Sequence, residues 1–173
     1  MYDLIVYDIH PQGESVNRLR SYRARSNLHG MTLAPSDMLC FALHSAAHAM
    51  HAAYAPLLDP LGLTYPQYLV LSQLAAQDGQ TVGAIGTALR LESNTLTPLL
   101  KRMQSAGWLT RARDDRDERQ VRITLTAEGR ALADRAAQVP RAFVERTGLE
   151  MAQIIDLRDI LGALRDRLKP ARG

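Results

Sequence analysis

The sequence predicts a mainly α-helical protein, and its composition supports that prediction in three ways. Hydrophobic residues make up 46% and charged residues 23% of the 173 positions, which suits a packed globular core. Aromatic residues make up only 5%, whereas β-sandwiches and barrels depend on aromatic and β-branched side chains. No apolar run reaches the roughly 18 residues of a membrane span. The length allows one ordinary domain with an extension.

The first 34 residues differ in composition from the rest and predict an N-terminal extension ahead of a domain over 35–173. Asp3 and Asp8 lie where a secretory signal would carry basic residues. We therefore expect a cytoplasmic protein with no membrane partner.

A first long helix is expected over about 36–58, where apolar residues recur every three or four positions. Ser36 follows a proline and is a suitable N-cap residue. The residues expected to end this helix are Pro56, Pro60 and Gly62.

The region 64–126 predicts three helices followed by a hairpin. Thr64 and Gln67 have the spacing of a capping box, which predicts a helix from there to about Gln77. Thr81 is the expected cap of a second, short helix after an Asp-Gly turn. A third helix ends near Gly107, and its expected apolar face consists of Leu96, Leu99, Leu100 and Met103.

The hydrophobic period then changes from helical to alternating. This change predicts two strands, over 109–113 and 121–125, joined by a charged tip. Thr126 is the expected cap of a helical region over 127–168 that is interrupted near Pro140. Its last helix carries an apolar seam that suits a partner helix, although packing within the monomer would use the same residues: Ile154, Leu157, Leu161, Leu164 and Leu168.

Two short helices followed by a hairpin with a basic tip are the element order of a winged helix-turn-helix, which places its second helix in the major groove of DNA. Residues 90–122 carry eight basic and five acidic side chains, and a solvated charged surface is the plainer interpretation of that excess. In the wing, Asp117 is expected to hold the guanidinium of Arg119 toward a minor groove, with a weak surface ion pair as the alternative. The other candidate DNA contacts are Ser93, Asn94, Thr95, Thr97, Lys101 and Arg102.

The segment 109–126, with Asp117-Glu118-Arg119 in its tip, resembles the wing of the multiple-antibiotic-resistance regulator (MarR) family. The stretches 39–43 and 57–68, which contain Cys40 and Thr64-Tyr65-Pro66-Gln67-Tyr68, resemble its organic-hydroperoxide-sensing branch, OhrR. The resemblance covers about residues 35–168. It implies a winged helix-turn-helix with N- and C-terminal dimerisation helices, over about 36–58 and 127–168.

Cys40 is the one cysteine of the chain, which excludes an intramolecular disulfide and any zinc site with two thiolates. A helix N-terminus stabilises thiolate, the form that attacks peroxide, although a lone cysteine is often inert packing. The resemblance implies that Cys40 is a redox sensor with Tyr54 and Tyr65 as hydroxyl partners. Because 14 residues of straight helix span about 21 Å, Cys40 and Tyr54 are expected to meet only across a dimer.

These features together predict a homodimeric repressor, without metal or cofactor, that binds double-stranded operator DNA and releases it when an organic hydroperoxide oxidises Cys40. With no second cysteine in the chain, a small cellular thiol is expected to complete the oxidation. One alternative is release by a small aromatic acid or a metal bound near His44, His48 and His51. An enzyme, a thiol peroxidase, is less favoured because the chain has no resolving thiol.

Overall fold

The computed structural model describes residues 33–114, 117 and 119–168, so nearly all of the expected extension over 1–34 lies outside the described residues. The chain divides into two compact units, Met1–His44 and Ser45–Gly173, and each is described by itself. No helix in the described ranges is both long enough and apolar enough to cross a bilayer.

The described part of the first unit contains a short 3-10 helix, η1 (Pro35–Asp37), and the beginning of helix α2 (Leu39–Leu58). The expected N-cap role of Ser36 is wrong, because Ser36 lies inside η1. Pro35 starts this separate turn, in which the backbone N–H of Met38 donates to the carbonyl of Pro35 at 3.0 Å. Helix α2 therefore begins at Leu39, and Cys40 is its second residue.

Helix α2 continues through Pro56 to Leu58, so this proline does not end it as the sequence suggested. Pro56 has no N–H to donate, so α2 lacks one of its backbone hydrogen bonds at this position. The chain turns instead at η2 (Asp59–Leu61), where Gly62 takes the left-handed conformation with φ 66°.

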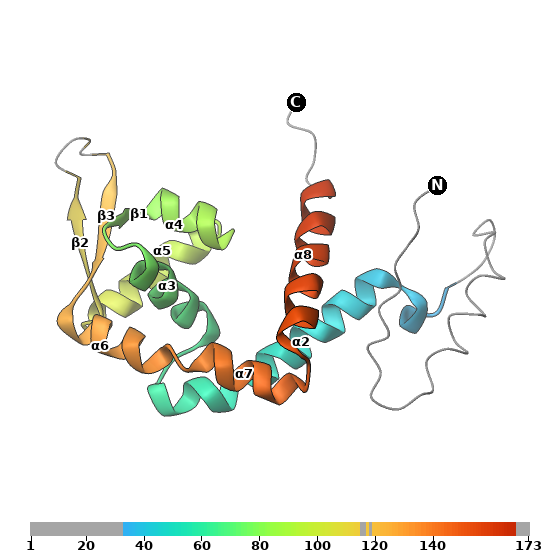
Figure 1. Ribbon diagram of the computed structural model, residues 1–173. Helices are drawn as coiled ribbons and strands as arrows, with labels where there is room; N and C mark the ends of the chain where they lie inside the picture. The colour runs from blue at the N-terminus through green and yellow to red at the C-terminus, as the bar shows by residue number, and fades with distance from the viewer. Residues whose placement is uncertain (1–32, 115–116, 118, 169–173) are drawn as a thin grey trace. The chain divides into compact units, whose positions relative to one another are not determined.

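The second unit contains the predicted helices and hairpin (Figure 1). The helices of the helix-turn-helix are α3 (Tyr65–Ala76), α4 (Val82–Leu89) and α5 (Ser93–Ser105), and the hairpin strands are β2 (Leu109–Arg113) and β3 (Val121–Leu125). The capping box is confirmed, since the N–H of Thr64 donates to Oε1 of Gln67 at 2.8 Å. Thr81 caps α4 by accepting from the N–H of Ala84 at 3.1 Å.

The sheet has one strand that the sequence did not predict. Strand β1 (Gln80–Thr81) pairs with β3, giving an antiparallel sheet of order β1-β3-β2. The register places Thr81 opposite Arg122, and Leu109 opposite Leu125. Two residues are too few to show an alternating pattern, so only the long-range pairing reveals this strand.

Among the described residues, three helices follow the hairpin: α6 (Ala127–Ala136), α7 (Val139–Thr147) and α8 (Met151–Arg167). Thr126 caps α6 through Gly129 at 3.0 Å, and the predicted interruption near Pro140 is confirmed by the break between α6 and α7. The hydrophobic core joins α3 to α6 and the sheet, whereas α8 has no buried residue. The core residues with no exposed surface are Val70, Leu71, Leu74, Ile85, Leu100, Met103 and Ile123.

Candidate nucleic-acid interface and sensor residues

Helix α5 has one buried and one exposed face. The four predicted apolar residues of this helix are all at most 3% exposed, and they fix it against α3 and α4. Ser93, Asn94 and Thr95 form its exposed first turn, whereas Thr97 is half-buried. Lys101 and Arg102 are exposed two turns later. The helix therefore presents small polar side chains at its N-terminus and cations further along, where they are able to contact base edges and phosphates.

In the wing, Asp117 binds two residues of the hairpin turn. Its Oδ1 accepts a hydrogen bond from the backbone N–H of Arg119 at 3.1 Å, and its Oδ2 accepts one from the side chain of Gln120 at 3.1 Å. Asp117 thus helps to shape the turn of the hairpin, through one backbone and one side-chain hydrogen bond. Arg119 itself is exposed.

Two arginines near the wing are engaged within the protein. Arg122 forms an ion pair with the buried carboxylate of Asp114 and donates to the carbonyl of Gly79 at 2.6 Å. Arg130 of α6 pairs with Asp78 at 2.6 Å. The pairing of Arg122 with Asp114 leaves the basic excess of residues 90–122 unchanged, because it takes up one charge of each sign.

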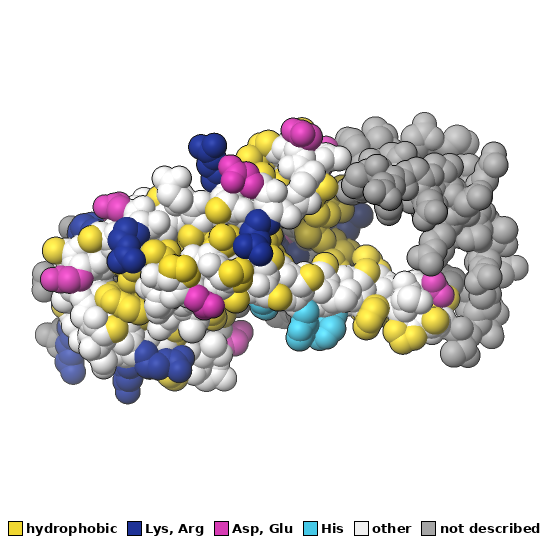
Figure 2. Space-filling view, turned by 90° about the horizontal axis from the view of Figure 1, so that it is seen from below, with side chains coloured by type: hydrophobic (Ala, Val, Ile, Leu, Met, Phe, Trp, Pro, Cys, Tyr) yellow, Lys and Arg dark blue, Asp and Glu magenta, His cyan; other side chains and the backbone are white. Residues whose placement is uncertain are grey.

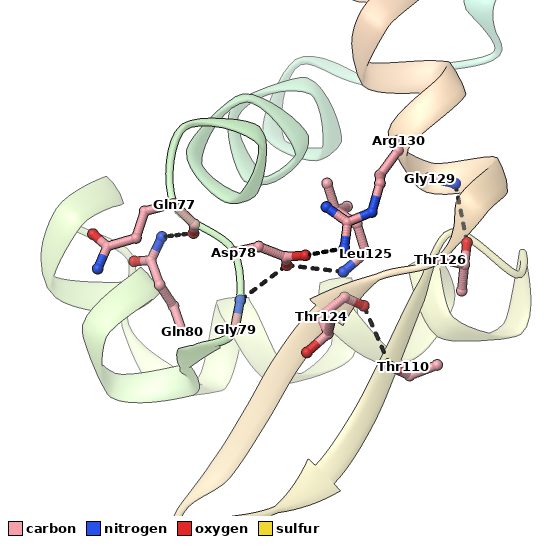
Figure 3. A network of polar contacts seen from close by, with 10 residues as sticks. All are labelled: Gln77, Asp78, Gly79, Gln80, Thr110, Thr124, Leu125, Thr126, Gly129 and Arg130. Atoms are coloured by element: carbon pink, nitrogen blue, oxygen red, sulfur yellow. Dashed lines mark hydrogen bonds and ion pairs between the residues drawn. The ribbon is translucent and has the colours of Figure 1, made fainter.

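Asp78 joins the turn after α3 to the base of the wing (Figure 3). Its Oδ1 accepts from the backbone N–H groups of Gly79 at 2.9 Å and Leu125 at 3.0 Å, while Oδ2 binds Arg130. The sequence marked Asp78 only as a turn residue, because its partner Leu125 lies 47 positions away.

Cys40 lies exposed in the first turn of α2, within the first unit. Its neighbours Leu39 and Phe41 are 62% and 45% exposed, so the turn presents apolar surface around the thiol. Such a surface favours contact with alkyl chains over contact with water.

The two predicted partner tyrosines, Tyr54 and Tyr65, lie together in the second unit. Their ring centroids are 4.9 Å apart with an edge-on geometry, and Phe143 of α7 stacks on Tyr54 at 4.2 Å. His51 packs on Tyr65 at 5.0 Å, and Tyr68 lies 5.9 Å from Tyr54. We call these five residues the aromatic cluster.

The phenols of the aromatic cluster keep their protons at neutral pH. Burial raises the pKa of Tyr54 from 10.0 to about 12, and the nearby Tyr68 and Tyr65 add to the shift. Burial also raises the pKa of Tyr65 and of Tyr68. A protonated phenol is a hydrogen-bond donor, so each tyrosine is able to donate to a thiolate.

The histidines of the alternative hypothesis lie along α2, and the space-filling view shows histidine side chains at the molecular surface (Figure 2). His44, His48 and His51 are exposed. Among the described residues, no three His, Cys, Asp or Glu side chains are arranged to hold a metal ion.

The chain is similar to known transcriptional regulators in sequence. It is 47% identical to the HTH-type transcriptional regulator TtmR of Methylorubrum extorquens, over 79% of this chain and 70% of the relative. It is 42% identical to the organic hydroperoxide resistance transcriptional regulator of Bacillus subtilis, over 74% of this chain and 85% of the relative. A family model for the transcriptional regulator SarA/Rot matches residues 52–136.

The fold is also similar to solved regulators. A structure of reduced AbfR bound to DNA superimposes with a TM-score of 0.66 at 30% identity, covering 88% of this chain and 99% of AbfR. The MepR–DNA complex of S. aureus shares the fold, with a TM-score of 0.68 at 22% identity over 76% of this chain and 98% of MepR. These relatives are regulators rather than enzymes. The chain belongs to the MarR family of winged helix-turn-helix transcriptional regulators, and it binds DNA.

Proposed function

We propose that this regulator is a homodimeric repressor that senses organic hydroperoxides through oxidation of Cys40. One observation carries the proposal: the single cysteine lies exposed in the first turn of α2, in a chain 42% identical to an organic hydroperoxide resistance regulator. The cytoplasm is the expected place of action, because the operator DNA lies there.

The DNA-binding half of the proposal uses α5 and the wing. Two copies of α5 would read the half-sites of a pseudo-palindromic operator through the exposed turn of Ser93, Asn94 and Thr95, with Thr97 beside it. Lys101 and Arg102 would contact phosphates, and Arg119 would enter a minor groove from the wing tip. Asp117 would support that tip by fixing the backbone at Arg119.

The proposed sensing reaction is a two-electron oxidation of Cys40. The Cys40 thiolate attacks the distal oxygen of the hydroperoxide, forming an S–O bond and breaking the O–O bond, and the alkoxide leaves as an alcohol after taking a proton. Sulfur is oxidised to sulfenic acid and the peroxide is reduced. A small cellular thiol then condenses with the sulfenic acid, giving a mixed disulfide and water.

Tyr54 and Tyr65 would couple the oxidation of Cys40 to DNA binding. In a dimer, the phenols of Tyr54 and Tyr65 would donate hydrogen bonds to the Cys40 thiolate of the other copy. Oxidation adds bulk to sulfur and removes its charge, so both hydrogen bonds weaken. A displaced Tyr65 would move the start of α3, whose far end adjoins the wing through Asp78.

The proposal is tested by adding cumene hydroperoxide to protein–operator complexes and following their mobility. Wild-type protein should be released, whereas Cys40→Ser should bind the operator as wild type does and stay bound. Met38→Leu is the matched control, since it removes a neighbouring oxidisable sulfur and should leave release unchanged. Release of Cys40→Ser by peroxide would refute the sensing role.

The alternative signal gives a different pattern. A small aromatic acid or a metal that acts near His44, His48 and His51 would raise the melting temperature equally with and without Cys40. Release by such a ligand, together with indifference to peroxide, would replace the redox proposal.

A further inference from the structure

We propose that Asp78 and Arg122 are positioning residues for the wing, so that operator binding depends on an acidic side chain and on an arginine that does not contact DNA. The proposal rests on DNA recognition by the wing, which is part of the proposed function. It concerns what sets the direction in which the hairpin leaves the helices.

The base of the wing is held by Asp78. One carboxylate oxygen accepts two backbone N–H groups, of Gly79 at 2.9 Å and of Leu125 at 3.0 Å. The other oxygen binds Arg130 of α6 at 2.6 Å (Figure 3). A single side chain thus ties together the end of α3, the last residue of β3 and the first turns of α6.

The middle of the wing is held by Arg122. Its Nη1 donates to the carbonyl of Gly79 at 2.6 Å, and its Nε faces the carboxylate of Asp114. Asp114 is only 4% exposed, and its backbone N–H donates to the carbonyl of Gln120 at 3.0 Å. A planar guanidinium is able to bind two acceptors in fixed directions, which a lysine ammonium on a flexible stem does not reproduce.

Both anchors converge on the turn of Asp78 and Gly79. This turn follows α3 directly, and α3 is packed against α4, α5 and α6 in the core. The turn contacts β3 at two points, at Leu125 through Asp78 and at Arg122 through the Gly79 carbonyl. Together with the pairing of β1 to β3, these two side-chain contacts fix the direction of the strand.

Charge alone and positioning predict opposite effects at Asp78. Removing a negative charge near DNA strengthens binding, because the phosphates repel that charge less. Removing an anchor of the wing weakens binding, because the wing tip no longer lies over its groove. Asp78→Asn is therefore expected to lower operator affinity about tenfold, the scale of losing a charged hydrogen bond.

The matched control is Glu128→Gln, which removes an exposed negative charge from the first turn of α6. It should bind operator at least as tightly as wild type. Footprints give a second measurement. In hydroxyl-radical footprints, Asp78→Asn should lose minor-groove protection at the wing positions. In methylation-protection footprints, it should keep major-groove protection at the α5 positions. Binding by Asp78→Asn that equals Glu128→Gln, with an unchanged footprint, would overturn the proposal.

Arg122→Lys tests the second anchor and also decides the matter if Asp78→Asn does not fold. The substitution keeps the positive charge, so a phosphate contact at this position would survive. The positioning role predicts reduced wing protection and several-fold weaker binding with an unchanged salt dependence. Arg141→Lys, on α7 and outside the proposed DNA contacts, should keep the affinity of wild type, and equal behaviour of the two lysine variants would reject the role of Arg122.

A wild-type footprint without protection by the wing would instead refute the expected minor-groove contact. That outcome concerns the proposed DNA contacts themselves. It is distinct from a footprint that is present in wild type and unaffected by the two anchor substitutions.

Discussion

Gly129 is required by the close approach of α6 to the beginning of the wing. A Cβ atom at this position would lie 1.8 Å from the carbonyl oxygen of Trp108. The same carbonyl accepts the N–H of Thr126 at 3.1 Å, and Thr126 Oγ1 accepts the N–H of Gly129 at 3.0 Å. The two backbone segments cannot easily move apart, because Thr126 is hydrogen-bonded both to the Trp108 carbonyl and to the Gly129 N–H.

Gly129→Ala is therefore expected to destabilise the protein by about 3 kcal/mol or more, the range of severe overpacking. Thermal unfolding followed by circular dichroism measures the change. Gly83→Ala is the control, since a Cβ there meets no atom within 4 Å and helix propensity predicts a gain of up to about 1 kcal/mol. Equal melting temperatures for the two variants would contradict the close approach.

Tyr54 should titrate well above an ordinary tyrosine, because burial raises its pKa to about 12. The raised value in the folded state means that unfolding releases a proton between about pH 10 and 12. Stability from this group is thus complete below pH 10 and is lost as the pH rises toward 12. Absorbance of phenolate against pH should show a high transition that Tyr54→Phe removes; a wild-type protein whose tyrosines all titrate near 10 would count against the buried cluster.

Residue roles were predictable where they depend on neighbours in sequence. The caps at Thr64, Thr81 and Thr126 bind residues three positions away, so their spacing was informative. The anchoring by Asp78 depends on a partner 47 positions away, and nothing local marks it. The family resemblance singled out Tyr54 and Tyr65 as partners of Cys40, but no spacing in the sequence marked their contact with each other.

Different parts of helix α5 are expected to determine DNA affinity and sequence specificity. Lys101 is exposed two turns beyond the proposed base-reading turn. Lys101→Ala should weaken binding to all sequences alike and reduce the slope of log affinity against log salt by about 1. Fluorescence anisotropy at several salt concentrations measures the slope.

Asn94→Ala should instead reduce discrimination between operator and random DNA with little change in that slope. Arg141→Ala is the control for both, since Arg141 lies on α7 and pairs with Glu145 at 3.0 Å. A change in slope on loss of Asn94, with none on loss of Lys101, would reverse the assignment.

In the described ranges, helix α8 exposes part of the apolar seam predicted from the sequence. Leu157 is 40% exposed and Leu161 is 38% exposed, and α8 has no buried residue. The proposed dimer would bury this seam. Leu161→Glu should therefore shift the mass measured by light scattering from dimer toward monomer, and should weaken operator binding through loss of the second half-site.

Asp159→Asn is the matched control for that substitution, because residue 159 lies across the helix from Leu157 and Leu161 by helical spacing. It should remain dimeric. A fully dimeric Leu161→Glu variant would mean that the two copies associate through another surface.

Helices and strands were predictable from the sequence where their hydrophobic pattern repeats over several residues. The alternation in 121–125 and the helical period in α5 both match the structure. The start of α2 was misplaced, because Pro35 begins a 3-10 turn that places Ser36 inside it. Strand β1 was missed because its two residues gain their structure from β3.

In the molecule as a whole, α3 is the proposed link between the Cys40 thiol and DNA. This helix begins at Tyr65, within the aromatic cluster, and the Asp78–Gly79 turn that holds the wing follows its end. A displacement at Tyr65 is thus expected to reach the wing along one packed helix. The proposed dimer would serve twice, by placing the phenols beside Cys40 and by matching two half-sites.

The central claim is that operator release follows the chemical state of Cys40. Samples treated with increasing cumene hydroperoxide and a small thiol are divided, and the modified fraction from intact-protein mass spectrometry is compared with the released operator fraction. If Cys40 is the sensor, the two fractions rise together and dithiothreitol reverses both. Release without any mass increase at Cys40, or full modification with the operator still bound, would contradict it.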